Sequence, residues 1–308
     1  MTALQDHVHD YLQIRRSVGF KLVAAGRLLL DFAAYADRAA VTTVTIDTAL
    51  GWASLPVGTN PVWISQRLSV VRQFARYLKT VDIDADVPAT NLLRAGSQRA
   101  TPYLYSADDV AALMAAARAI RNPLRAATFA TMIGLLACTG MRGGEAMRLD
   151  RGEIDWSQHQ LIVRDSKFGK SRLLPLQPST LDALAAYDAL RTKLCPTPQT
   201  ASFLVSSTGT RLSHPTVQPT FRQLLAQAGI TACPPRRRPR IHDLRHSFAV
   251  RTLLGWYHDG EDVQARMPSL STYLGHVDPA ATYWYLTAAP ELMAIAAARL
   301  EAAFGSPA

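Results

Sequence analysis

The chain has 308 residues, of which 48% are hydrophobic and 19% charged, so its composition allows a buried core and excludes an intrinsically disordered protein. Its 33 lysines and arginines outnumber 24 aspartates and glutamates, and the net charge of +9 favours a polyanionic partner such as nucleic acid. Three scattered cysteines without a CxxC pair argue against structural zinc and a disulfide framework. No signal-peptide pattern is found and no apolar run approaches the ~18 residues that a membrane span needs, so we expect a cytoplasmic protein without a membrane partner.

The first hundred residues are predicted to be helical. Apolar residues recur at helical spacing over 22–36, and a second helix is predicted to begin at Asn60-Pro61, a good cap and first-turn pair. On one face of this second helix, three basic residues follow at i, i+4 and i+7: Arg72, Arg76 and Lys79. Alone, such a face is more often simply solvated; if other segments of the chain act on nucleic acid, we expect it to contact phosphates.

A domain boundary is predicted near residue 100. The stretch 91–102 has the glycine and polar composition of a linker, and Ser106-Ala-Asp-Asp109 after it is a capping box that opens a new helix. We therefore divide the chain into a helical domain over 1–95, a linker over 96–104 and a second domain over 105–308.

The second domain is predicted to be mainly helical with a small β-hairpin. A buried helix over 123–138 should stop at Gly140. Two short apolar runs, 161–163 and 173–176, enclose a charged, glycine-containing turn over 165–170 and form the hairpin. Further helices are predicted at about 179–194, 214–228 and 241–256, after Pro279, and over 290–303.

Two segments around the hairpin carry candidate cations. In Thr139-Gly-Met-Arg-Gly-Gly-Glu145, a helix ends at Gly140 and Arg142 begins the next turn, where backbone N–H groups already favour an anion. The competing interpretation is an ordinary surface pair between Arg142 and Glu145. Lys167 lies in the hairpin turn, and by itself it would be an ordinary solvated lysine.

The strongest local signal is Ile241-His-Asp-Leu-Arg245. His242 and Arg245 stand at i, i+3 and share one helix face, which suits an oxyanion, although a buried structural histidine is the alternative. A proline-rich basic run leads into this helix, and we expect its arginines to contact DNA: Arg236, Arg237, Arg238 and Arg240.

The last segment of interest is Leu274-Gly-His276, followed by a short helix that carries Tyr283 and Tyr285. Closely spaced aromatic residues more often pack in a core than act in catalysis. Because residues two apart on a helix point about 200° apart, only one of the two tyrosines can face a site.

Taken together and in this order, these segments resemble the tyrosine recombinases, the phage integrase family, over about residues 105–290. The family pattern has an arginine in a TGxR-x-x-E context, a hairpin lysine, HxxR, and LGH followed nine residues later by the nucleophilic tyrosine. The resemblance implies that Glu145 supports a catalytic set of six residues: Arg142, Lys167, His242, Arg245, His276 and Tyr285. It also implies an α+β catalytic domain, a helical DNA core-binding domain over 1–95, and catalysis without a metal or other cofactor.

Three features depart from the family pattern. Gly144 stands where the family often has serine, and His276 follows Arg245 by 31 positions, a longer gap than we expect, so 256–266 should form an extra loop or helix extension. The Tyr283/Tyr285 doublet offers two nucleophiles, between which the nine-residue spacing favours Tyr285. The Tyr-Trp-Tyr-Leu ending is similar to that of transposon-type recombinases.

The activity implied by the resemblance is site-specific cleavage and rejoining of double-stranded DNA through a 3′-phosphotyrosyl intermediate, as in the integration or transposition of a mobile element. A helix from Pro290 would dock on a neighbouring protomer in a homo-tetramer on paired DNA sites; packing on its own domain is the alternative. Two other functions stay open: a topoisomerase IB-like enzyme that rejoins only the original strands, and a catalytically inactive DNA-binding relative. Intact candidates at every catalytic position count against inactivity, and the apolar C-terminal helix counts against a topoisomerase.

Overall fold

The structure, a computed structural model, describes most of the chain in two compact units, Met1–Arg99 and Ala100–Ala308. The residues described are 3–55, 57–81, 83–90, 92–93, 101–164, 171–231, 238–276 and 278–288, with single positions at 294, 297, 301 and 305. They are mainly helical with one small antiparallel sheet, which confirms the predicted fold class. None of the helices among them is long and apolar enough to cross a membrane.

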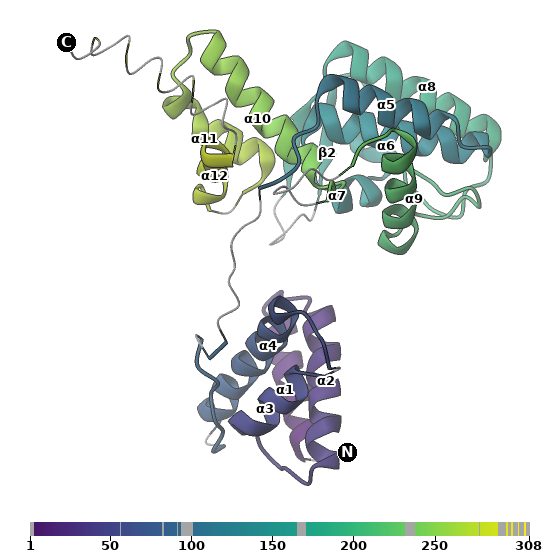
Figure 1. The fold of residues 1–308 in the computed structure, drawn as a ribbon. Coiled ribbons are helices and arrows are strands. Elements are labelled where there is room, and N and C mark those ends of the chain that lie inside the picture. The colour runs from purple at the N-terminus through teal and green to yellow at the C-terminus, as the bar shows by residue number, and fades with distance from the viewer. Residues whose placement is uncertain are drawn as a thin grey trace. The chain divides into compact units, whose positions relative to one another are not determined.

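The first unit is a bundle of helices: α1 (Ala3–Ser17), α2 (Val23–Arg38), α3 (Ile46–Ala53) and α4 (Pro61–Thr80) (Figure 1). Its core is built from aromatic and aliphatic side chains of all of these helices, including Phe32, Trp52 and Phe74. The predicted start of α4 is confirmed, because the Asn60 side chain accepts a hydrogen bond from the Val62 N–H at 2.8 Å.

The predicted basic face of α4 is wrong at Arg72. Arg72 is only 7% exposed, and its guanidinium donates to the backbone carbonyls of Pro88 and Ala89, at 2.6 and 2.9 Å. The reason is geometric, since Leu68, Val71 and Ala75 beside it on the helix are all buried against the core. Arg72 therefore links α4 by hydrogen bonds to the segment around Pro88 and Ala89. Arg76 and Lys79, by contrast, are exposed.

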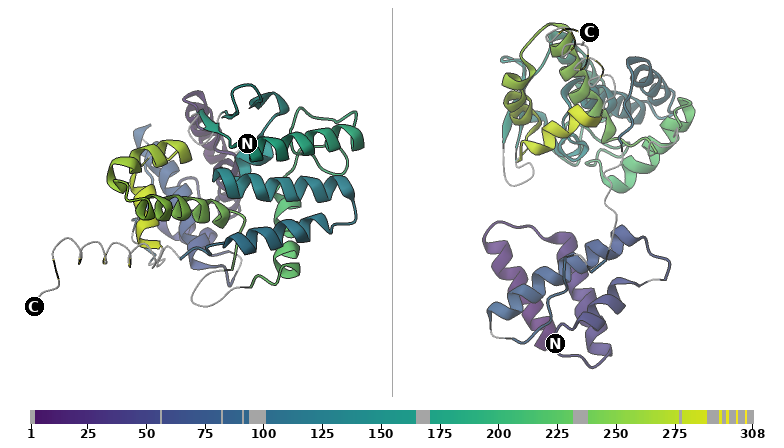
Figure 2. Two further views of the ribbon diagram at one scale, coloured as in Figure 1. Left: turned by 90° about the horizontal axis from the view of Figure 1, so that it is seen from above. Right: turned by 60° about the vertical axis from the view of Figure 1, so that its left-hand side comes forward.

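The second unit is built around the buried helix α6 (Pro123–Thr139), which lies between α5 (Ala107–Arg118) and α8 (Pro178–Leu194) (Figure 2). The predicted start of α5 and the predicted end of α6 are both confirmed. Ser106 and Asp109 form the capping box of α5, with reciprocal hydrogen bonds of 3.0 and 2.9 Å. Gly140 ends α6 in the left-handed conformation, with φ of +59°.

The predicted hairpin is confirmed and has one more strand than expected. β1 (Ile154–Asp155), β2 (Gln160–Val163) and β3 (Arg172–Pro175) form an antiparallel sheet in the order β1-β2-β3, with Ile162 opposite Leu173. The short helices α7 (Gly143–Arg148) and η1 (Arg151–Glu153) lie between α6 and this sheet in the chain, and α9 (His214–Gln227) follows α8.

The end of the second unit has a hydrophobic cluster of its own. It is shared by α10 (Asp243–His258), α11 (Val263–Leu274) and α12 (Ala280–Ala288), and it contains Leu253, Met267 and Tyr285. The long interval between Arg245 and His276 is thereby explained: α10 runs on to His258, the chain turns at Gly260, and α11 fills the remainder. The helix predicted over 290–303 falls almost wholly outside the described residues.

Candidate active site

Arg142 stands directly before α7 and is held there by Glu145. The Glu145 carboxylate accepts the main-chain N–H of Arg142 at 2.9 Å and its Nη1 at 2.8 Å. The other terminal nitrogen, Nη2, donates to the carbonyl of Gly275 at 2.7 Å. Although Glu145 and Gly275 hold the Arg142 side chain in place, 23% of that side chain is still exposed to solvent.

Glu145 binds a second arginine that sequence reasoning did not single out. Arg172, the first residue of β3, donates to both carboxylate oxygens at 3.1 and 2.8 Å, and its Nε donates to the Tyr273 carbonyl at 2.7 Å. Burial by itself would raise the pKa of Glu145, but the hydrogen bonds and charges of Arg172 and Arg142 lower that pKa to about 2. Glu145 is therefore ionised at neutral pH.

Arg245 lies deeper than Arg142, with 2% of its surface exposed. It projects from the first turn of α10, and its terminal nitrogens donate to the carbonyls of Gly140 at 2.9 Å and Leu274 at 2.6 Å. Burial, followed by the neighbouring charge of Arg142, lowers the pKa of Arg245 to about 10. The guanidinium thus remains charged at neutral pH. The two carbonyls that hold it belong to residues two positions before Arg142 and two positions before His276.

His242, the N-cap of α10, contacts His246, and His246 in turn contacts the C-terminal aromatic residues. The His242 ring lies 4.8 Å from that of His246, and the His246 ring lies 5.3 Å from Trp284 and 5.5 Å from Tyr285. His242 is exposed at the surface, yet desolvation of its ring and the charges of nearby arginines lower its pKa to about 4. His242 is consequently neutral at physiological pH.

The two tyrosines of α12 point in opposite directions, as their spacing predicts. Tyr285 is 2% exposed, whereas Tyr283 is 45% exposed. The Tyr285 ring stacks beside that of His276 with 6.0 Å between centroids, and its ionised form would favour the charge on Arg245. His276 is oriented in turn by a 2.6 Å hydrogen bond between its Nδ1 and the buried hydroxyl of Thr282.

The structure therefore brings six of the predicted site residues together in the second unit: Arg142, Glu145, His242, Arg245, His276 and Tyr285. Lys167, Arg236 and Arg237 lie outside the described residues. Arg238 and Arg240 are exposed before α10, and the Arg240 guanidinium pairs with Asp243 at 3.1 Å.

Sequence reasoning passed over Arg172, His246 and Thr282. An arginine in the otherwise apolar strand Arg172-Leu-Leu-Pro175 was a usable signal, because a cation at a sheet position needs a partner. His246 directly follows the HxxR pattern, but its inward orientation comes from the packing of α10 against α12.

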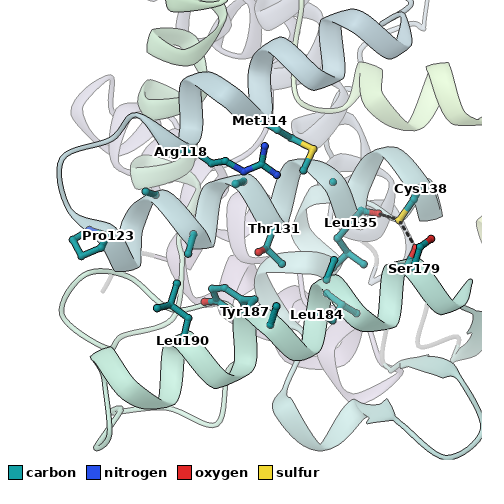
Figure 3. Close-up of a pocket in the computed structure, with 17 residues that line it drawn as sticks. Met114, Arg118, Pro123, Thr131, Leu135, Cys138, Ser179, Leu184, Tyr187 and Leu190 are labelled. Carbon is teal, nitrogen blue, oxygen red and sulfur yellow. Dashed lines mark hydrogen bonds between the residues drawn. The ribbon is translucent and has the colours of Figure 1, made fainter.

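A surface pocket of about 620 Å³ lies apart from this site. It is bounded by α5, α6 and α8 and lined mainly by apolar side chains such as Met114, Leu184 and Leu190 (Figure 3). None of the predicted site residues lines it. Within the described part of the chain, no three histidine, cysteine, aspartate or glutamate residues are grouped as metal ligands.

Comparison with known proteins identifies clear relatives. A model of the phage integrase family matches residues 104–291. The chain is 40% identical over 307 residues to y4rB, a protein of Sinorhizobium fredii (strain NBRC 101917 / NGR234) that is named as an integrase/recombinase. The match covers 98% of each chain. It is 32% identical over 240 residues to the tyrosine recombinase XerD of Caulobacter vibrioides, covering 77% of this chain and 74% of that protein.

A solved structure shares the fold. The Tn1549 transposon integrase in complex with transposon right end DNA superposes with a TM-score of 0.67 at 17% identity, over 97% of this chain and 99% of that one. At this low sequence identity, the structural match supports a shared fold and nothing further.

Proposed function

The chain belongs to the phage integrase family of tyrosine recombinases, enzymes of site-specific DNA recombination, and we propose that it cleaves and rejoins DNA through a 3′-phosphotyrosyl intermediate on Tyr285. The observation that carries this proposal is the placement of Tyr285. It is buried against His276 and lies within electrostatic reach of Arg245, while Tyr283 points to solvent.

Arg142 and Arg245 are the proposed binding groups for the scissile phosphate. Attack on a phosphodiester increases the negative charge on its non-bridging oxygens, and fixed cations stabilise that charge best when they need not reorganise. Both guanidinium groups are fixed by backbone carbonyls, Gly275 for Arg142 and Gly140 with Leu274 for Arg245. A guanidinium also stays charged and can donate to two phosphate oxygens at once.

The nucleophile must lose a proton as it attacks, because a tyrosine hydroxyl has an ordinary pKa of ~10. The neutral His242 is the proposed acceptor. The centroid of the His246 ring lies 4.8 Å from that of His242 and 5.5 Å from that of Tyr285, so His246 is near both residues. The Tyr285 oxygen then forms a bond to phosphorus while the bond from phosphorus to the 5′ oxygen breaks. His276, fixed by Thr282, is proposed to donate to a phosphate oxygen.

The 5′ oxygen leaves well only if it receives a proton, and Lys167 is the proposed donor on the strength of its place in the hairpin sequence. The covalent product keeps the energy of the phosphodiester. A 5′-hydroxyl from the same or another strand can therefore reverse each step and rejoin the DNA without ATP or a metal ion.

Double-stranded DNA is the proposed substrate, with the helical first unit binding its backbone. Arg76, Lys79, Arg238 and Arg240 are proposed to contact phosphates, since all four are exposed. Exchange of strands between two sites requires several active centres in one complex, so we propose a homo-tetramer on paired sites, linked through the segment after Pro290.

The direct test is to incubate the protein with duplex DNA from the ends of the element that encodes it, in the presence of a chelator. We expect an adduct that survives detergent, disappears with protease, and blocks the 3′ end of the cut strand. An adduct that blocks the 5′ end, or cleavage that stops with the chelator, would contradict the proposal.

A further inference from the structure

The position of Glu145 creates an electrostatic difficulty for a phosphate-binding site. Its carboxylate lies 2.8 Å from the Arg142 guanidinium, and its side chain is 1% exposed. At such a distance a buried carboxylate cancels most of the field of its partner cation, because little water is present to screen it. An isolated Arg142–Glu145 pair would therefore offer an incoming phosphate almost no net charge.

Arg172 supplies the missing charge. Its side chain is only 9% exposed, and it binds Glu145 through both terminal nitrogens in the two-pronged geometry that suits a carboxylate. With Arg172 present, the cluster of two arginines and one glutamate has a net charge of +1. Without Arg172, it would be neutral.

The surroundings of Arg172 indicate a defined position. Its Nε donates to the Tyr273 carbonyl at 2.7 Å, and its guanidinium lies against Gly275, where an added Cβ would come within 3.0 Å of Nη1. Gly275 has a φ of +69°, and its carbonyl accepts from Arg142. Arg142 and Arg172 thus both lie against Gly275, the residue that precedes His276.

We propose that Arg172 is a positioning residue that neutralises Glu145, so that the charge of Arg142 remains available to the scissile phosphate. This inference rests on the proposed function, in which Arg142 binds that phosphate. Arg172 itself does not touch the DNA in this scheme. Its contribution to catalysis passes through Glu145, and the effect of losing Arg172 should depend on whether Glu145 is charged.

The test compares single-turnover cleavage by the full-length wild type with that of Arg172→Gln, Arg172→Lys, Glu145→Gln and the double variant Glu145→Gln/Arg172→Gln. We expect Arg172→Gln to slow cleavage by at least about 10-fold, a smaller effect than direct removal of a charge-stabilising donor. Arg172→Lys, which keeps the charge, should be less affected. The double variant should cleave faster than Arg172→Gln alone, because no carboxylate then offsets the charge of Arg142.

Two further measurements separate this role from simple packing. Arg266→Gln, which removes an arginine from the exposed pair with Glu261, is the matched control and should cleave like the wild type. A substrate whose scissile phosphate is a neutral methylphosphonate should reduce the defect of Arg172→Gln, because a neutral centre needs less cationic charge.

A double variant slower than Arg172→Gln, with an equal defect on the charged and neutral substrates, would overturn the inference and make Arg172 a packing residue. Wild-type protein that forms no covalent adduct would instead contradict the proposed function itself, so the two failures can be told apart.

Discussion

Replacing Arg245 with methionine should separate catalysis from stability. Burial and the neighbouring charge of Arg142 lower the pKa of Arg245 from its ordinary value to about 10, which corresponds to a cost of about 3 kcal/mol for holding the charge in the protein. This cost applies in full at every pH below about 10 and shrinks only as the pH rises through that value. Methionine would remove the cost while filling similar space.

The substitution also removes two hydrogen-bond donors. The carbonyls of Gly140 and Leu274 would lose their bonds to Arg245, at about 1–3 kcal/mol for each buried group left without a donor. The two effects oppose each other, so the free energy of unfolding should lie between about 1 kcal/mol above and about 3 kcal/mol below that of the wild type. Cleavage should nevertheless fall by at least about 100-fold, the usual result of losing one fixed charge-stabilising donor.

Urea unfolding, DNA-binding titration and single-turnover cleavage measure the three quantities. Leu253→Ala is a matched control in the same helix, because Leu253 is fully buried and its truncation should cost about 2–5 kcal/mol without a selective loss of cleavage. If Arg245→Met loses DNA binding and cleavage in equal proportion, or unfolds like a severe core variant, Arg245 is a structural residue and the reasoning fails.

Three other predictions concern the carboxylate, the DNA-binding surface and assembly. Glu145→Gln should cost about 3 kcal/mol at pH 7, since the folded pKa of about 2 lies below 4.5, and this cost should shrink as the pH falls from 4.5 towards 2; a cost independent of pH in urea unfolding would contradict it. The double variant Arg76→Ala/Lys79→Ala should reduce the magnitude of the slope of log affinity against log salt by about 0.9 for each phosphate that is no longer neutralised, whereas the exposed Lys193→Ala should not; equal slopes for both variants and the wild type would remove α4 from the interface. Removal of residues 290–308 should leave a protein that binds one DNA site but does not pair two, as measured by native gel shift, and full recombination by this protein would refute the tetramer model.

Local signals in the sequence predicted the ends of helices well. Asn60, Ser106 with Asp109, and Gly140 each act through atoms within four residues, so their effect does not depend on the rest of the fold. The opposite orientations of Tyr283 and Tyr285 could likewise be predicted, because the turn of the helix fixes them.

The errors and omissions depend on contacts between distant segments. Arg72 lies beside the buried positions Val71 and Ala75, but the carbonyls of Pro88 and Ala89 that accept its hydrogen bonds come from a later segment that returns to α4. Arg172 gains its importance from Glu145 and Tyr273, which lie 27 and 101 residues away in the chain. Such partners follow from the tertiary structure, and no pattern of local spacing contains them.

The most direct test of the account is to identify the residue that becomes covalently attached to DNA. Protease digestion of the trapped adduct, followed by mass spectrometry, should place the phosphotyrosyl bond on Tyr285. Tyr285→Phe should form no adduct, while Tyr283→Phe, which changes only a solvent-facing ring, should form it at close to the wild-type rate. An adduct on Tyr283, or one that persists in Tyr285→Phe, would contradict the proposed nucleophile and with it the arrangement of the site.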